Sequence, residues 1–156
     1  MPLPTIGSLA PAFSLPDQTG TLHNLSDYKG QWVITYFYPK ALTSGCTTQA
    51  CTLRDNMAAL KALNCVVLGI SPDAPTLLAK FFEKEGLNFT LLGDQDHKMA
   101  DAYGAWQQKS MYGRTYMGMA RMTVLIDPTG IVREVWPKVK PEQQAADILE
   151  WFKSNK

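Results

Sequence analysis

The segment Gln31–Tyr38, with the sequence QWVITYFY, constrains the fold of this chain more than any other. It is almost continuously β-branched and aromatic, which is typical of a strand buried on both faces. Such strands lie in the centre of parallel or mixed sheets that helices cover. Pro39 ends the run, and apolar residues at helical spacing predict a helix from about Thr43 to Leu63. The segment therefore predicts an α/β fold.

The rest of the chain alternates strands and helices around this central strand. A turn at 16–20 joins two short extended pieces, 12–15 and 21–24, which predicts an N-terminal β-hairpin. The further predicted elements are a turn or short helix at 24–30, strands at 66–71 and 89–92, helices at 75–85, 97–103 and 141–152, and a hairpin at 121–127 and 130–136. This order predicts a thioredoxin-like fold in a single domain, 1–156, with a mixed central β-sheet, flanking helices and the hairpin in front.

Charge and hydropathy exclude several classes of function. The chain has 15 basic and 14 acidic residues and a formal net charge of +1, so no basic surface is expected to bind nucleic acid. A run of about 18 apolar residues, which a membrane span requires, does not occur. The segment Met1–Thr5 lacks the basic and apolar regions that begin a secretory signal, so a cytoplasmic location is expected. Thiols in a reducing compartment stay free unless they are catalytic or sensing.

Cys46 lies in the first turn of the predicted helix, directly after the buried strand. Free N–H groups and the helix dipole favour an anion at this position, and the thiolate is the nucleophilic form of cysteine. Cleavage of a peroxide by a thiolate also requires polar donors and protection from water. Thr43 can bring a hydroxyl into the same pocket, and Pro39 can close one side of it. Arg121, at the start of an apolar strand, is the best candidate for a cation that faces the thiolate.

Each of these residues also has a purely structural interpretation. Cys46 alone fits a small buried hydrophobic residue, and Thr43 alone fits a helix N-cap. Proline ends many strands, and Arg121 alone fits a surface ion pair. Cys65 is predicted to pack in the core, with a role as an alternative resolving thiol as a minor hypothesis. No metal or other cofactor is expected, because the cysteines show no paired C-x-x-C spacing.

Cys51 follows Cys46 by five residues. On a continuous α-helix two such residues lie about 140° apart around the axis, with Cα atoms roughly 8.6 Å apart. A disulfide requires Cα atoms closer than about 7 Å. We therefore predict a segment that is helical when reduced and locally remodelled if the bond forms, which the poor helix formers Thr47 and Thr48 favour. The alternative for Cys51 is a buried helix residue.

The pattern Pro39-x-x-x-Thr43-x-x-Cys46 resembles the active-site motif of the peroxiredoxins. The segment Gly45–Cys51, GCTTQAC, with Arg54 and Asp55, narrows the resemblance to the bacterioferritin comigratory protein or peroxiredoxin Q subgroup. Ser44 is a departure, because many members have proline there. The resemblance extends over nearly the whole chain, including segments 13–17, 36–40, 68–71, 88–92 and 125–127.

This resemblance implies a thioredoxin-like fold and the reduction of hydrogen peroxide and organic hydroperoxides. It implies that Cys46 is the peroxidatic cysteine and that Cys51 resolves its sulfenic acid as an intramolecular disulfide. Thioredoxin or a similar dithiol is the implied reductant, and the implied oligomeric state is a monomer. The implied substrate-binding residues are Pro39, Thr43, Gly45 and Arg121, of which Thr43 and Arg121 polarise the peroxide.

Three other functions use parts of the same pattern. A peroxide sensor would share the oxidation chemistry and use the remodelled helix as a signal. A thiol–disulfide oxidoreductase is disfavoured because Thr43 stands where the first cysteine of C-x-x-C would be. A non-catalytic thioredoxin-like module would need no reactive thiol. Four apolar residues either favour bulky hydroperoxides near the pocket or pack in the core and loops: Trp106, Met111, Tyr116 and Met117.

Overall fold

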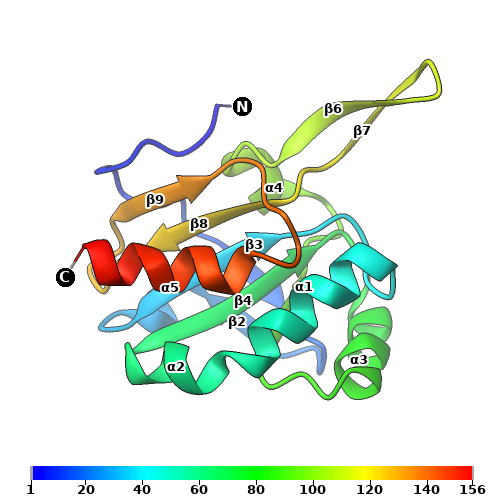
Figure 1. The fold of residues 1–156 in the computed structure, drawn as a ribbon. Coiled ribbons are helices and arrows are strands. Elements are labelled where there is room, and N and C mark those ends of the chain that lie inside the picture. The colour runs from blue at the N-terminus through cyan, green and yellow to red at the C-terminus, as the bar shows by residue number, and fades with distance from the viewer. Residues whose placement is uncertain (1, 156) are drawn as a thin grey trace.

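A five-stranded mixed sheet forms the centre of the computed structural model, which describes residues 2–155. Its strands are β3 (Trp32–Phe37), β4 (Cys65–Ser71), β5 (Thr90–Gly93), β8 (Met122–Ile126) and β9 (Val132–Trp136). The spatial order is β5-β4-β3-β8-β9, in which β3, β4 and β5 are parallel and β8 runs antiparallel to β3 and β9. The sequence prediction of a mixed sheet is confirmed, and the strand at 32–37, predicted to be buried, stands at its centre (Figure 1).

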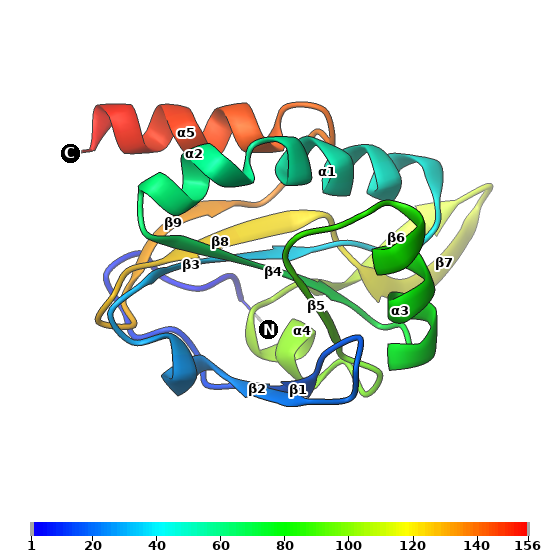
Figure 2. The same cartoon turned by 90° about the horizontal axis from the view of Figure 1, so that it is seen from below.

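Helices cover the sheet on both faces. They are α1 (Ser44–Asp55), α2 (Met57–Ala62), α3 (Pro75–Lys84), α4 (Lys98–Ala102) and α5 (Gln144–Ser154). Figure 2 shows α1, α2 and α5 on one face, and α4 with the N-terminal segments on the other. Alternate side chains of β3 divide between the two cores, with Ile34 and Tyr36 in one cluster and Val33 and Phe37 in the other. Within residues 2–155, no helix is long and apolar enough to cross a membrane.

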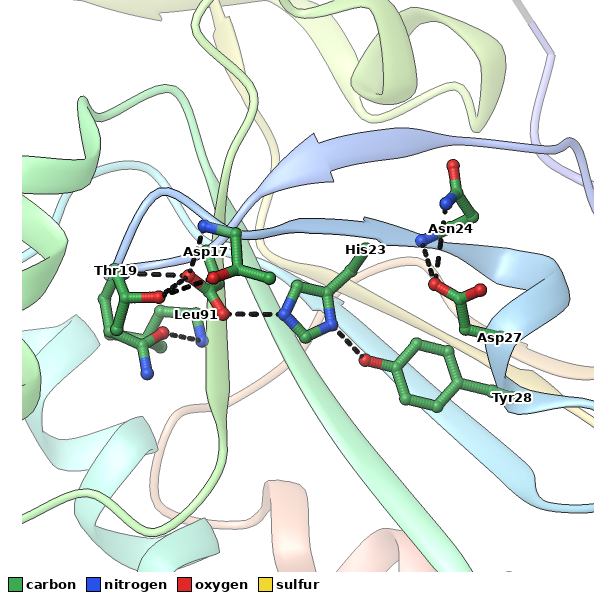
Figure 3. A network of polar contacts seen from close by, with 9 residues as sticks. Asp17, Thr19, His23, Asn24, Asp27, Tyr28 and Leu91 are labelled. Atoms are coloured by element: carbon green, nitrogen blue, oxygen red, sulfur yellow. Dashed lines mark hydrogen bonds and ion pairs between the residues drawn. The ribbon is translucent and has the colours of Figure 1, made fainter.

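The predicted N-terminal hairpin is present as β1 (Ser14–Pro16) and β2 (Leu22–Asn24), followed by the 3-10 helix η1 (Leu25–Tyr28). A chain of polar contacts holds these pieces together (Figure 3). His23 Nε2 lies 2.6 Å from Asp17 Oδ2, and His23 Nδ1 lies 2.6 Å from the Tyr28 hydroxyl. The hairpin and η1 are therefore linked by side chains as well as by strand pairing.

Asp17 is the most connected member of this network. Burial opposes its ionisation, but hydrogen bonds from Thr19, His23 and Thr21 outweigh burial and lower the pKa of Asp17 from 3.8 to about 2. The next residue, Gln18, accepts a hydrogen bond from the Leu91 N–H at 3.1 Å. The hairpin is thus fixed to the edge strand of the main sheet.

The predicted helix from Thr43 to Leu63 is wrong in one respect, because it is divided at Asn56 into α1 and α2. Asn56 leaves the helical conformation, with φ −110° and ψ 8°. Its side-chain amide donates to the Thr52 carbonyl at 2.7 Å, which offers the backbone an alternative to continued helix. Both cysteines of the motif nevertheless lie on the unbroken helix α1.

The sequence did not predict the third sheet, a hairpin of β6 (Trp106–Met111) and β7 (Arg114–Met119). Figure 1 shows it projecting away from the body of the molecule. Tyr112 and Gly113 both have positive φ, 52° and 78°, as a two-residue type I′ turn requires. Met111, Tyr116 and Met117 are exposed, so their interpretation as core packing is wrong, whereas Trp106 is half-buried and stacks on His97.

Candidate active site

Cys46 is the third residue of α1, in its first turn, after the loop that leads from the carboxyl end of β3. Thr43 is the N-cap of this helix, so the N–H groups of Ser44, Gly45 and Cys46 have no carbonyl partner within the helix. Leu42, in the loop before the cap, has a positive φ of 68°, which strains a branched residue. The Cys46 side chain is only 1% exposed, and its thiol is free. The predicted strand–loop–helix context of the cysteine is confirmed.

Arg121 brings a cation to this thiol, as the sequence predicted. One guanidinium nitrogen, Nη1, donates to Cys46 Sγ at 3.4 Å and to Gln49 Oε1 at 2.8 Å. Arg121 directly precedes β8, and β8 pairs with β3. Because β3 leads to Cys46, this pairing places the arginine beside the cysteine. The contact gives the sulfur a positively charged hydrogen-bond donor.

Gln49 and Gln144 form a buried amide pair behind this arginine, and sequence reasoning assigned neither a role. Both side chains are at most 1% exposed. Gln49 Nε2 donates to Gln144 Oε1, which also accepts from the Thr123 hydroxyl at 2.8 Å. This arrangement turns the Gln49 oxygen toward Arg121, so α5 helps to orient the cation. Gln49 lies one helical turn beyond Cys46, a spacing that places a polar side chain on the same face of the helix.

Gly45 lies against the same arginine. A Cβ atom at Gly45 would be 3.1 Å from Arg121 Nη2 and 3.9 Å from Pro141 Cγ. A side chain at this position would therefore push the guanidinium away from Cys46. The glycine keeps space for the cation beside the start of α1.

Thr43 and Pro39 lie on the loop that leads into α1, but neither forms a hydrogen bond to Cys46. The Thr43 side chain is exposed, and its hydroxyl donates to the Lys40 carbonyl at 2.8 Å. The Thr43 oxygen keeps its capacity to accept a hydrogen bond. Pro39 is half-buried two residues after β3 and adds no N–H donor to the loop.

Cys51 has a different environment from Cys46. Its partly buried thiol donates to Glu85 Oε1 at 3.5 Å. Burial raises the pKa of Cys51, and the hydrogen bond to Glu85 raises it further. Both cysteines have free thiols on the intact helix α1, five residues apart, as expected for the reduced form.

Cys65 lies in the core at the start of β4, as predicted. Burial raises its pKa to about 12, so it stays a thiol under ordinary conditions. Among residues 2–155, no three His, Cys, Asp or Glu side chains lie close enough together to hold a metal ion.

The fold and this thiol centre define a thioredoxin-like enzyme that uses cysteine chemistry. Residues 6–135 match the model of the AhpC/TSA family. The chain is 50% identical over 149 residues to peroxiredoxin Bcp of Escherichia coli K12, covering 96% of each chain. It is 43% identical over 148 residues to peroxiredoxin Bcp of Bacillus subtilis, covering 95% of this chain and 94% of that one.

Solved structures agree with these relatives. A mutant of PrxQ from Xylella fastidiosa superposes with a TM-score of 0.92 at 31% identity, over 99% of this chain and 98% of that one. A bacterioferritin comigratory protein of Xanthomonas campestris, described by its alkyl peroxide reduction activity, gives a TM-score of 0.86 at 32% identity, over 91% and 90%. The chain belongs to the AhpC/TSA family and is a peroxiredoxin, that is, a thiol peroxidase.

Proposed function

We propose that this enzyme reduces hydrogen peroxide and organic hydroperoxides in a cycle that uses Cys46 and Cys51. The observation that carries the proposal is the contact of Arg121 Nη1 with Cys46 Sγ at the free N–H groups of α1. A cation and unpaired N–H donors beside one sulfur can hold a peroxide against it and stabilise a leaving oxygen. The reported alkyl peroxide reduction by the Xanthomonas campestris relative supports the substrate class.

In the first step the Cys46 thiolate attacks one peroxide oxygen and the O–O bond breaks. The sulfur loses two electrons and becomes a sulfenic acid, while the other oxygen takes a proton and leaves as water or an alcohol. Arg121, the α1 N–H groups and the Thr43 oxygen are the proposed contacts to the two oxygens. Gly45 gives the guanidinium room, and Pro39 shields one side of the pocket from water.

In the second step the start of α1 unwinds and Cys51 attacks the Cys46 sulfur. A disulfide forms, and the sulfenic oxygen leaves as water with the thiol proton of Cys51. Ser44, Thr47 and Thr48 at the helix start are weak helix formers, which supports unwinding there. Thioredoxin or a similar dithiol then reduces the disulfide by exchange.

We also propose that the enzyme acts as a cytoplasmic monomer. Cys46 and Cys51 belong to one helix, so resolution requires no second chain. Three free thiols suit a reducing compartment, where a dithiol reductant is available.

The proposal is tested by stopped-flow oxidation of the reduced protein, with the disulfide then located by mass spectrometry. Cys46→Ser should abolish the fast, catalytic turnover of peroxide. Cys51→Ser should allow one fast turnover and then stop in the presence of thioredoxin, whereas the matched control Cys65→Ser should keep full turnover. Peroxidase activity in Cys46→Ser would refute the proposed nucleophile, and normal thioredoxin-supported turnover in Cys51→Ser would refute the resolving step.

A further inference from the structure

The second cysteine has a carboxylate partner that the proposed cycle does not use. Glu85 directly follows α3, and its Oε1 atom accepts a hydrogen bond from Cys51 Sγ at 3.5 Å. The side chain of Glu85 is half-buried, so water screens this contact only in part. A carboxylate that accepts from a thiol stabilises the protonated form of that thiol.

Other contacts hold the same part of α1 to the loop after α3. Arg54 Nη1 donates to the Glu85 carbonyl oxygen, and Asn88 Nδ2 donates to the Arg54 carbonyl oxygen at 3.3 Å. Together with the thiol contact, these hydrogen bonds attach the C-terminal half of α1 to residues 85–88. The N-terminal half of α1 has no contact with this loop among the hydrogen bonds of residues 2–155 and is held by Arg121 and Gln144 instead.

We infer that Glu85 is a positioning residue that keeps Cys51 protonated and in place while Cys46 reacts with peroxide. The role of Cys51 as the resolving thiol rests on the proposed function, but the contact with Glu85 does not. A thiol is a much weaker nucleophile than a thiolate, so this contact directs peroxide to Cys46. The attached half of α1 then provides a fixed target toward which the unwound Cys46 segment moves.

The charges around Cys51 come from two elements. Glu85 lies after α3, and Asp55 and Arg54 lie on α1. Burial raises the pKa of Cys51 most, Glu85 and Asp55 raise it further, and Arg54 lowers it. Arg54 also pairs with Asp55 at 3.0 Å, which reduces the separate influence of each on the thiol. Glu85 is therefore the charged group whose removal should change the protonation of Cys51 most.

The test is the pH dependence of Cys51 alkylation in the reduced protein. Iodoacetamide is the alkylating reagent, and mass spectrometry measures how much of Cys51 has reacted at each pH. Glu85→Gln keeps the size of the side chain and the backbone carbonyl that Arg54 binds. We expect the midpoint of the alkylation curve to move to lower pH. The rate at pH 8 should rise about two- to fourfold, because more thiolate forms while each thiolate becomes less nucleophilic. The control Glu83→Gln alters an exposed carboxylate of α3 and should leave the curve unchanged.

A Glu85 that controls the protonation of Cys51 and a Glu85 that only covers its thiol predict different alkylation curves. An unchanged midpoint in Glu85→Gln would overturn the inference, as would faster alkylation at every pH without a shift, because that result indicates only greater exposure of the thiol. A second measurement uses the Cys46→Ser background, where Cys51 meets peroxide alone. Adding Glu85→Gln should accelerate the oxidation of Cys51 several-fold, and equal rates would contradict the inference. Neither measurement depends on whether Cys46→Ser retains peroxidase turnover, which tests the proposed function separately.

Discussion

Cys46 and Cys51 lie on one helix, yet the two halves of α1 surround them with opposite charges. Cys46 is buried against the Arg121 guanidinium, whereas Cys51 faces the Glu85 carboxylate. The same functional group therefore has a cationic hydrogen-bond donor beside it at one end and an anionic acceptor at the other, and at Cys51 burial and the carboxylate raise the pKa of the thiol. The environment of each cysteine is therefore set by elements distant in sequence, since Arg121 precedes β8 and Glu85 follows α3.

Removing the cation from the Cys46 half should have the largest effect. Arg121→Met should lower the second-order rate of Cys46 oxidation by about a hundredfold to a thousandfold, because a preorganised donor at the reacting oxygens is lost. Alkylation of Cys51 should not change. Stopped-flow kinetics measures the first rate, and Arg114→Met at the exposed hairpin is the control. A decrease of less than about threefold would show that Arg121 is not what makes the environment of Cys46 different from that of Cys51.

A substitution at Asp17, in the polar network of the β1–β2 hairpin, tests whether the stability of the fold and the environment of the two thiols are independent. The Asp17 carboxylate has a folded-state pKa of about 2, below its ordinary value of 3.8, so it contributes stability above pH 4. That contribution, about 2 kcal/mol, should be lost as the pH falls from about 4 to about 2. Denaturation of Asp17→Asn across this range should show a flatter pH dependence than the wild type. Equal slopes would contradict the assignment, and altered Cys46 or Cys51 alkylation at pH 7 would show that the hairpin also controls the thiols.

The buried amide pair of Gln49 and Gln144 should stabilise only the Cys46 half of α1, residues 44–50. Gln144→Ala leaves the Gln49 amide and the Thr123 hydroxyl without their acceptor, which should lower the free energy of unfolding by about 1–3 kcal/mol. Hydrogen exchange should accelerate at residues 44–50 and stay unchanged at 52–55. Denaturant titration and exchange mass spectrometry measure the two effects, with the exposed Gln143→Ala as control. Equal acceleration in both halves would remove the distinction between them.

Ser44→Pro should give the smallest effect. Ser44 is the first residue of α1, and Thr43 before it is extended, with φ −85° and ψ 156°, so proline fits without strain. The substitution should stabilise the helix start by about 0.4–1 kcal/mol and slow disulfide formation about two- to fivefold. Peroxide attack should be affected less, because Arg121 and the N–H groups of Gly45 and Cys46 remain in place. Rapid-quench mass spectrometry separates the two steps, and faster disulfide formation would contradict unwinding from this end.

Much of this fold could be predicted because local patterns agree with the final structure. The segment at 31–38 reads as a central strand, and Pro75 begins a helix as expected. The break at Asn56 could not be predicted, because it depends on one side-chain amide turning back to a carbonyl. The hairpin β6–β7 was missed because most of its side chains are exposed and carry no apolar periodicity.

The candidate site was predicted in part for similar reasons. The motif marks Cys46 directly, and an arginine that precedes a buried strand stands out as a charge in need of a partner. Gln144 and Glu85 carry no such signal, since each acquires its role only when α5 or the end of α3 packs against α1. Polar residues that act through another side chain are visible only once the tertiary contacts are known.

In the proposed cycle the Cys46 half of α1 comes apart to reach a Cys51 half that stays in place. Hydrogen exchange of the reduced and the peroxide-oxidised protein, with the disulfide located in the same samples, tests this rearrangement. We predict a Cys46–Cys51 bond, lost protection at residues 44–50 and retained protection at 52–55. A bond to Cys65, or a Cys46–Cys51 bond with protection at 44–50 unchanged, would contradict it.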